Sequence, residues 1–352
     1  MSRALAIRPM LLPALRRFWR DPHRLQLGTA PGRAVILELT DPAAARLLDL
    51  LDGTRTRAGL IRAAVARDID GESADRIISV LSEAGLVVDA EAVRPRDVSE
   101  ATRRRLDAEV CALALGRRSG ATPAAVLRRR LAAQVLITGS SRLAVPVATV
   151  LASSGIGHID PDLSGVTRIT DAVPGGLAPE DARRPRGVAA ADAVRRAAPD
   201  IDLSSLRQGR ATFAVLVGAG GPAELTALSY DTRRLAHLAV TIRDGIVVVG
   251  PLVRPGRSPC LNCIDLHRRD RDPGWPAIAA QLQTTTDPLE PAAATTVLAA
   301  AAYAAAEVLD HIDGEVPRTV GATVEISRAG EWTRRQWPLH PACDCQRRRR
   351  VR

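Results

Sequence analysis

The chain has 352 residues, 46% of them hydrophobic, which suffices for two domains with separate cores. Its formal charge is +10, but all 49 basic residues are arginine, and they are scattered, while aromatic residues amount to only 2%. This composition argues against a nucleic-acid partner, because base-stacking surfaces need aromatic side chains. The longest apolar stretch, Ala292 to Leu309, contains Tyr303 and Glu307, so we expect a core helix and no membrane span. Met1 to Leu15 lacks a secretion signal, which favours a cytoplasmic protein without disulfides.

Residues 1 to 92 have the pattern of a small α+β domain. We expect two strands, Arg24 to Leu27 and Ala34 to Leu39, then three helices and a final strand, Leu86 to Val88. The first helix is capped by Asp41, the second starts near Thr56, and the third is capped by Ser73. This is the order of a winged-helix-like module. A DNA-binding regulator is therefore one hypothesis, although the acidic residues Glu72, Asp75 and Glu83 on the third helix argue against contact with phosphates.

Three segments of this domain, Leu25 to Gly28, Ala34 to Leu37 and Leu50 to Thr56, resemble the PqqD-type leader-peptide recognition element. The resemblance implies that an extended leader peptide adds a strand to the sheet edge and packs on the third helix. Carried onto this chain, the peptide contacts would be Val35, Ile36, Leu37, Ile77, Ile78 and Leu81. These apolar positions fit a plain hydrophobic core equally well.

Residues 93 to 130 are rich in arginine and are expected to form a helical connector, in which Cys111 is a structural residue. The last residues, 347 to 352, form a basic tail that we expect to be solvated. Residues 131 to 346 form the second predicted domain.

The second domain opens with the pattern of a dinucleotide-type βαβ unit. A buried strand, Gln134 to Thr138, is followed by a turn from Gly139, a helix from Val145 to Ala152, and a strand from Gly155 to Asp160. Two later strands, at 213–217 and 246–250, continue the alternation. The sequence therefore predicts an α/β fold with a Rossmann-like, mostly parallel sheet.

Two cysteine pairs, Cys260 with Cys263 and Cys343 with Cys345, predict a structural zinc site. A two-residue spacer lets both thiolates of the first pair reach one metal ion, and four thiolates leave no position open for water. The second pair has a one-residue spacer, which is shorter than usual. His267 and His340 are alternative ligands, and two separate redox-active cysteine pairs are the alternative to a metal site.

The stretches from Gly250 to Cys263 and from His340 to Cys345 resemble the ThiF family, relatives of ubiquitin-activating enzymes. The resemblance implies a Rossmann-like fold whose structural zinc is held by two such cysteine pairs. Members of the family transfer adenylyl groups from ATP with Mg²⁺, and many of them form homodimers.

The ATP-binding residues implied by this resemblance are largely replaced. Gly139 remains, but Arg142 follows it where the family has a glycine-rich turn. The ribose-binding acid would be Asp160 or Asp162, and the catalytic lysine is replaced by Arg184 or Arg186. The run from Gly218 to Gly221 offers no carboxylate for magnesium. We therefore expect Gly139, Asp160 and Arg186 to face any nucleotide, and we predict no catalytic residue.

A leader-binding domain fused to a degraded activating-enzyme fold resembles the partner proteins of azole and azoline peptide cyclodehydratases. The resemblance implies a non-catalytic protein that binds the leader of a precursor peptide and presents it to a YcaO-type cyclodehydratase. The alternative hypothesis is an ATP-dependent adenylyltransferase that activates the C-terminus of a peptide or a carrier protein.

Overall fold

The computed structural model describes residues 7–95, 97–116, 121–206, 210–218, 230, 233–284 and 289–345. The chain divides into two compact units, Met1–Arg128 and Arg129–Arg352. The predicted basic tail, 347–352, and residues 219–221 of the glycine run lie outside the described residues. Within the described part, every helix is too short or too polar to cross a lipid bilayer.

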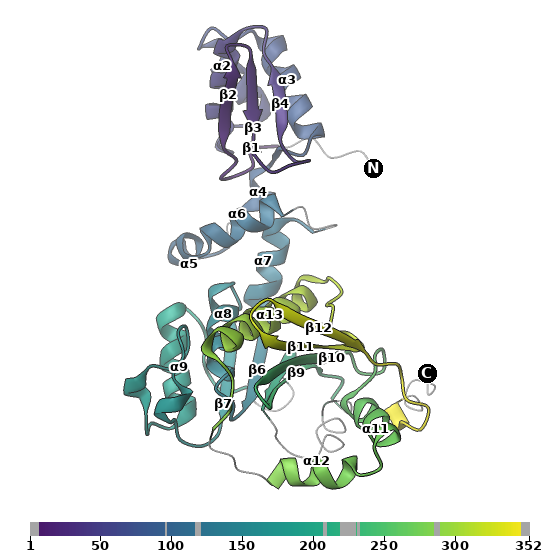
Figure 1. Ribbon diagram of the computed structural model, residues 1–352. Helices are drawn as coiled ribbons and strands as arrows, with labels where there is room; N and C mark the ends of the chain where they lie inside the picture. Colours follow the sequence, from purple (N-terminus) through teal and green to yellow (C-terminus); the bar gives the residue numbers. More distant parts are fainter. Residues whose placement is uncertain are drawn as a thin grey trace. The chain divides into compact units, whose positions relative to one another are not determined.

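The first unit contains a three-stranded antiparallel sheet with β3 at its centre (Figure 1). Its strands are β2 (Arg17–Asp21), β3 (Arg24–Leu27) and β4 (Val35–Glu38). A second antiparallel pair joins β1 (Pro9–Leu11) to β5 (Val87–Asp89). The strands expected at β3, β4 and β5 are confirmed. Neither β1 nor β2 was expected, because β1 has three residues and the arginine-rich, largely exposed β2 lacks alternating apolar positions.

The helices of this unit, and the one that leads out of it, are short and mostly amphipathic. They are η1 (Pro42–Arg46), α1 (Leu47–Leu50), α2 (Arg57–Val65), α3 (Gly71–Glu83), α4 (Ala90–Val93), α5 (Glu100–Arg105), α6 (Asp107–Leu115) and α7 (Pro123–Ala132). Asp41 caps its helix as expected, and Thr56 caps the helix that was expected to start near it; both side chains accept backbone hydrogen bonds. The expectation that Ser73 caps the third helix was wrong. Asp70 is the cap, and its carboxylate accepts a bond from the backbone N–H of Ser73 at 2.8 Å.

The second unit is built on a seven-stranded sheet in the order β12-β11-β10-β9-β8-β6-β7. The strands are β6 (Gln134–Gly139), β7 (His158–Leu163), β8 (Phe213–Val217), β9 (Ala236–Arg243), β10 (Ile246–Val253), β11 (Ala322–Arg328) and β12 (Glu331–Gln336). Strands β7, β6, β8 and β9 are mutually parallel, and the pairs β9–β10, β10–β11 and β11–β12 are antiparallel. Strand β11 therefore runs with the parallel group, so the predicted mostly parallel α/β sheet is confirmed.

Helices cover this sheet (Figure 1). They are α8 (Ala144–Ser153), η2 (Ile169–Asp171), η3 (Pro179–Asp181), α9 (Arg186–Ala197), α11 (Leu261–Arg271), α12 (Trp275–Thr284) and α13 (Ala294–Asp313). Helix α8 packs against both α9 and α13, and α13 also lies along β10. Nearly every residue of α8 is buried, so the turn that precedes this helix is fixed firmly to the core.

Two glycines decide the geometry of the βαβ unit. A Cβ on Gly139, whose φ is +129°, would lie 1.9 Å from the carbonyl oxygen of Val217 on the neighbouring strand. A Cβ on Gly157 would lie 1.9 Å from the carbonyl oxygen of Leu131. Residues 155–157 therefore form a tight turn, and β7 starts at His158, three residues later than the sequence predicted.

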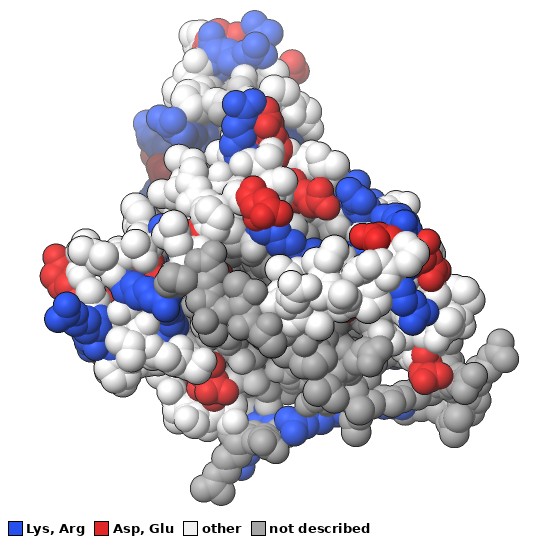
Figure 2. All heavy atoms as spheres, turned by 60° about the horizontal axis from the view of Figure 1, so that its bottom comes forward, with Lys and Arg blue, Asp and Glu red and all other residues white. Residues whose placement is uncertain are grey.

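Charged side chains of both signs are intermixed on the surface. On the face shown in Figure 2, blue arginines lie next to red carboxylates. Exposed pairs of this kind include Arg195 with Asp192 at 3.0 Å and Arg104 with Glu100 at 2.8 Å. This mixture differs from the continuous basic surface that a nucleic-acid backbone selects.

One buried and one half-buried histidine make the stability of the second unit depend on pH. Burial lowers the pKa of His237 to about 4, and burial next to Arg254 lowers the pKa of His311 to about 4. Both rings are therefore neutral in the folded chain at pH 5, whereas in the unfolded chain they are mostly protonated. Because the unfolded state binds more protons, we expect the free energy of unfolding to fall as pH drops from 6.5 to 4.

Urea denaturation at pH 7 and at pH 4.5 measures this effect. For each unit by which the pKa of a histidine is lower in the folded chain than in the unfolded chain, the free energy of unfolding falls by at most about 1.4 kcal/mol. The double variant His237→Gln/His311→Gln should be less sensitive to pH in this window, although it is less stable overall. Folding lowers the pKa of carboxyl groups such as Asp52 and Asp89, so their contribution to stability is lost at lower pH, where they become protonated. An unchanged pH dependence in the double variant would contradict the assignment.

Candidate metal centre and closed nucleotide turn

The four predicted zinc ligands lie together in the second unit. The Sγ atoms of Cys260, Cys263, Cys343 and Cys345 all lie within 4.8 Å of one another. Cys260 is 3.9 Å from Cys263 and 3.6 Å from Cys343, and Cys263 is 3.5 Å from Cys345. Tetrahedral zinc with Zn–S bonds of about 2.3 Å requires sulfur separations of about 3.8 Å. The cluster therefore has the size of a four-thiolate zinc site.

Secondary structure explains why the two pairs meet. Strand β10 ends at Val253, and the following loop delivers Cys260 to the position before α11 and Cys263 to its first turn. The second pair follows β12 at the far end of the described chain. Apolar neighbours, among them Val253, Leu266 and Leu339, surround the sulfurs and exclude water.

The two histidines considered as alternative ligands have other partners. The Nε2 atom of His340 lies 2.8 Å from a carboxylate oxygen of Asp270, and its Nδ1 accepts a hydrogen bond from the backbone N–H of Ala342. The Nε2 atom of His267 lies 3.1 Å from the carbonyl oxygen of Pro338. His340 thus orders the turn that leads into Cys343, while the donor set consists of the four cysteines.

The electrostatics of the cluster also suit a cation. The Cys260 thiol donates to Cys263, which raises the pKa of Cys260 to about 12 and lowers the pKa of Cys263. Contact with Cys260 and Cys263 raises the pKa of Cys345 as well. The sulfurs therefore cannot all ionise unless a cation balances their charge, which a divalent metal such as zinc supplies.

The turn between β6 and α8, where the ThiF resemblance implies nucleotide phosphates, is occupied by another part of this chain. One carboxylate oxygen of Glu290 accepts hydrogen bonds from the Ser141 hydroxyl at 2.7 Å and from the backbone N–H of Arg142 at 2.8 Å. Donors at the start of a buried helix form an anion site. Here the anion is a side chain of the segment that leads into α13.

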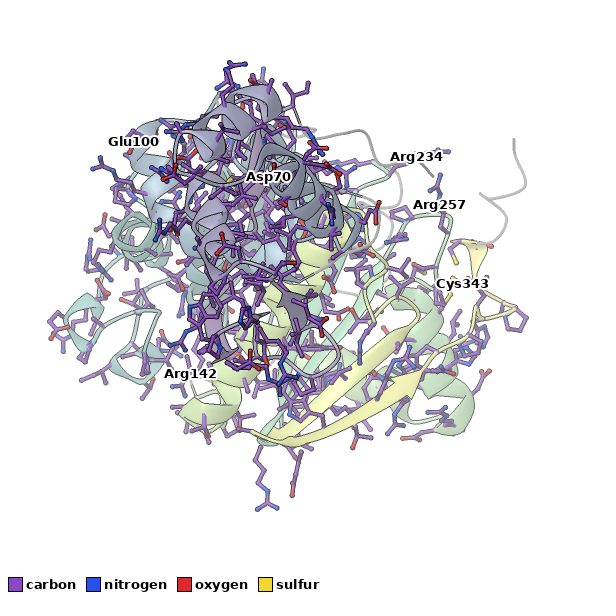
Figure 3. All side chains as sticks on the ribbon, turned by 90° about the horizontal axis from the view of Figure 1, so that it is seen from above. Asp70, Glu100, Arg142, Arg234, Arg257 and Cys343 are labelled. Atoms are coloured by element: carbon purple, nitrogen blue, oxygen red, sulfur yellow. The ribbon has the colours of Figure 1, made fainter. Side chains whose placement is uncertain are left out.

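The Arg142 side chain adds to this closure. Its guanidinium donates to the carbonyl oxygen of Ala292 at 3.4 Å and to that of Ala172 at 3.3 Å. It therefore bridges the segment before α13 and the loop after η2. Figure 3 shows Arg142 well apart from Cys343, so the closed turn and the cysteine cluster are separate features of the second unit.

The other two residues expected to face a nucleotide are turned into the protein. Asp160 lies in the middle of β7, is 7% exposed, and accepts a hydrogen bond from the backbone N–H of Leu206 at 2.7 Å. Burial raises the pKa of its carboxyl group. Arg186 starts α9, is 5% exposed, and forms an ion pair with Asp171 at 3.0 Å.

These residues do not fit a bound nucleotide. The phosphate position holds the Glu290 carboxylate, and a second anion placed there would be repelled. Gly139 is required by its contact with Val217, and so its presence does not indicate phosphate binding. Asp160 is buried and Asp162 is the exposed acid of β7. The position at which the family has a magnesium-binding aspartate corresponds to the run from Gly218 to Gly221, most of which lies outside the described residues.

The predicted peptide contacts divide into three groups. Leu37, Ile78 and Leu81 are buried and belong to the core of the first unit. Val35 and Ile77 are half-buried, and Ile36 is 43% exposed on β4. Of these six residues, Ile36 alone is exposed to solvent. The outer edge of β4 has no paired strand among the described residues.

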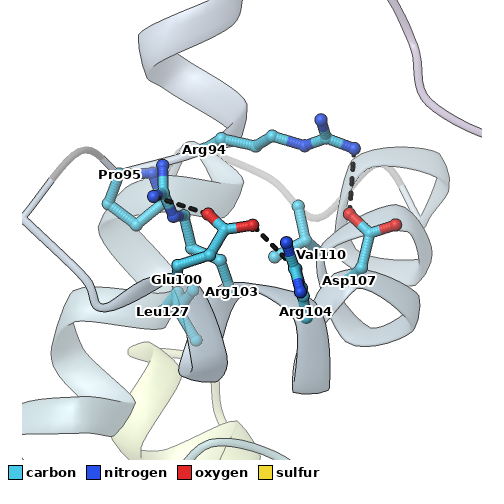
Figure 4. A pocket seen from close by; sticks show the side chains of 8 residues that line it. All are labelled: Arg94, Pro95, Glu100, Arg103, Arg104, Asp107, Val110 and Leu127. Atoms are coloured by element: carbon cyan, nitrogen blue, oxygen red, sulfur yellow. Dashed lines mark hydrogen bonds and ion pairs between the residues drawn. The ribbon is translucent and has the colours of Figure 1, made fainter.

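A hollow of about 340 Å³ lies among the connector helices of the first unit (Figure 4). Its three arginines are all paired. Glu100 contacts Arg103 at 2.7 Å and Arg104 at 2.8 Å, and Arg94 contacts Asp107 at 2.9 Å. These pairs engage every charged side chain of the lining, so we assign the hollow a structural role.

Sequence reasoning missed Glu290. Its partners Ser141 and Arg142 lie 149 and 148 residues earlier in the chain, and a single glutamate before an alanine-rich helix carries no local motif. The bulky Arg142 in the turn was the available signal. It indicated that phosphates are not bound there, without identifying what replaces them.

No protein-family model and no curated protein matches this sequence. Solved structures do match. Escherichia coli MccB with ATP is 17% identical with a TM-score of 0.64, covering 96% of this chain and 99% of that chain. The microcin C7 biosynthetic enzyme MccB with N-formylated MccA is 16% identical with a TM-score of 0.63 and the same coverage. PaaA is 16% identical with a TM-score of 0.64, covering 92% of this chain and 98% of that chain. At these identities the likeness establishes the ThiF-like fold alone.

Proposed function

We propose that this protein is a non-catalytic, ThiF-like partner protein that binds the leader of a ribosomally made precursor peptide and presents it to a YcaO-type cyclodehydratase. The observation that carries the proposal is the Glu290 carboxylate on Ser141 and Arg142. A protein whose phosphate position is filled by its own glutamate is suited to binding rather than to adenylyl transfer.

The structural likeness supports the peptide part of the proposal. It covers nearly the full length of MccB, including the portion aligned with the first unit, and MccB has been crystallised with the peptide MccA. In our proposal the first unit of this chain captures the leader by strand addition, with Ile36 and Val35 on the β4 edge as candidate contacts. The metal centre, which we propose to hold zinc, fixes the end of the second unit.

Magnesium ATP is expected to leave the melting temperature of the protein unchanged. A nucleotide present at 100 times its dissociation constant stabilises a protein by about 2.7 kcal/mol. In a unit of this size each kcal/mol corresponds to about 2–4 °C. A bound nucleotide would thus be plain in a thermal shift assay, and MccB, crystallised with ATP, is the positive control. A rise of several degrees would favour the alternative, an ATP-dependent adenylyltransferase acting on a peptide or carrier-protein C-terminus.

Calorimetry with the leader encoded beside the gene tests the binding role directly. We expect a complex with micromolar or tighter affinity that does not depend on ATP. We expect Ile36→Glu to weaken this complex. The control Trp332→Ala, at an exposed site in the second unit, should leave the affinity unchanged. Absence of any binding at high micromolar concentrations would refute the proposed function.

A further inference from the structure

The first unit has a second open sheet edge, at β2. Among the described residues, strand β2 pairs with β3 alone, through Arg17–Leu27, Phe18–Gln26 and Trp19–Leu25. The backbone N–H of Gly28 donates to the carbonyl oxygen of Arg16, and hydrogen-bonded pairs alternate with non-bonded ones in an antiparallel ladder. The N–H and C=O groups of Arg17 and Trp19 therefore point outward, toward the open edge, where an added strand would bond to them.

A hollow of about 440 Å³ lies beside this edge. One wall is the face of β2 and β3 that carries Arg17, Trp19 and Leu25, and the other is formed by η1 and α1, from Pro42 to Asp49. Leu25 is 2% exposed and belongs to the core, whereas Trp19 is 52% exposed. The hollow is thus an open end of the domain core, and a side chain inserted there would extend that core.

The charges around this edge are unbalanced. Arg17 pairs with Asp49 and Arg24 pairs with Asp21. In the part of the chain that the structure describes, Arg16, Arg20 and Arg46 have no carboxylate partner, so the edge carries three uncompensated positive charges. Arg16 lies on the side of the strand opposite to Trp19, because side chains alternate along a strand. Arg20 lies where the register of β2 against β3 shifts, between Trp19 and Asp21.

We propose that the β2 edge and its hollow bind an extended acidic peptide segment with apolar residues at alternate positions. The segment adds a strand to β2 and places an apolar side chain against Trp19 and Leu25, and its carboxylates pair with the uncompensated arginines around the edge, Arg16 and Arg20. The inference rests on the proposed function, because it adds a second sheet edge, and the chemistry of the segment bound there, to the β4 contacts proposed for the leader. Strand β4 differs in carrying Glu38 and no uncompensated arginine.

A labelled peptide of alternating leucine and glutamate, titrated against the full-length protein by fluorescence anisotropy, tests this inference. We expect binding that Trp19→Ala and Arg20→Glu each weaken by about tenfold or more. Trp332→Ala and Arg76→Glu, at exposed positions away from the hollow, should change the affinity by less than about twofold. Arg20→Glu should also gain affinity for a leucine–lysine peptide, which a misfolded variant would not do.

Other outcomes overturn the inference without touching the proposed function. The β2 site is wrong if the cognate leader binds but only Ile36→Glu disrupts it, because the peptide then uses β4. It is also wrong if the leucine–glutamate peptide does not bind while Trp19→Ala dissolves a homodimer, because a second copy of the chain then occupies the edge. Failure of the proposed function itself appears separately, as nucleotide binding or as absence of any leader complex.

Discussion

Serine in place of Cys263 is expected to abolish metal binding and to lower the melting temperature of the second unit by about 10 °C or more. Cys263 is fully buried, and its sulfur contacts two of the other three ligands. Structural zinc sites contribute apparent binding free energies of about 10–16 kcal/mol, which is comparable with the whole stability of a domain. A site reduced to three thiols would lose much of that contribution.

The damage should be local at first. The sulfurs pack with Val253, Leu266 and Leu339 in a cluster that is separate from the main core around β6, β8 and α8. Hydrogen exchange is therefore expected to quicken in α11 and in residues 337–345, while β6 and β8 stay protected. A metal ion in this cluster would join Cys260 to Cys343, 83 residues apart in the chain, so its loss would also free a long loop.

Elemental analysis of the purified chain gives the decisive number, which we expect to be one zinc per molecule. Cys111→Ser is the matched control, because Cys111 is the only cysteine outside the cluster and should be replaceable without loss of metal. If the wild-type protein carries no metal and has the same melting temperature as Cys263→Ser, the cluster is not a zinc site.

Local patterns predicted the parts of this molecule that depend on neighbours in sequence. Asp41 and Thr56 mark helix starts because an N-cap acts on residues two or three positions ahead. Each cysteine pair is recognisable because its two cysteines are separated by the short spacer that is typical of metal ligands. Buried strands such as β6 and β8 are visible as compact apolar runs.

Features that depend on distant contacts escaped prediction. The partner of Glu290 is chosen by the packing of α13 on α8, which no sequence window contains. The residues of β2 are mostly charged, and the strand forms because its backbone pairs with β3. For the same reason the pattern around Leu37, Ile78 and Leu81 could not separate peptide contacts from core, and burial assigns these three to the core.

Replacing Asp313 by alanine is expected to destabilise the second unit by about 3–5 kcal/mol. The Asp313 carboxylate receives two hydrogen bonds from Arg130, at 2.9 Å and 2.7 Å, and both side chains are almost fully buried. The variant would leave the Arg130 guanidinium buried without its carboxylate. Urea denaturation measures the change. Arg195→Ala, in an exposed pair with Asp192, should cost less than about 1 kcal/mol.

This ion pair also links the two helices that border the closed turn. Arg130 donates to the Ser154 carbonyl just after α8 and to Asp313, the last residue of α13. It thereby joins the C-terminal ends of the two helices whose N-terminal ends meet through Ser141 and Glu290. The double variant Arg130→Leu/Asp313→Leu should recover more than half of the lost stability, because neither charge is then stranded. If Asp313→Ala alone proves as stable as the wild type, the ion pair does not hold these helices together, and the closure must depend on the Glu290 contacts themselves.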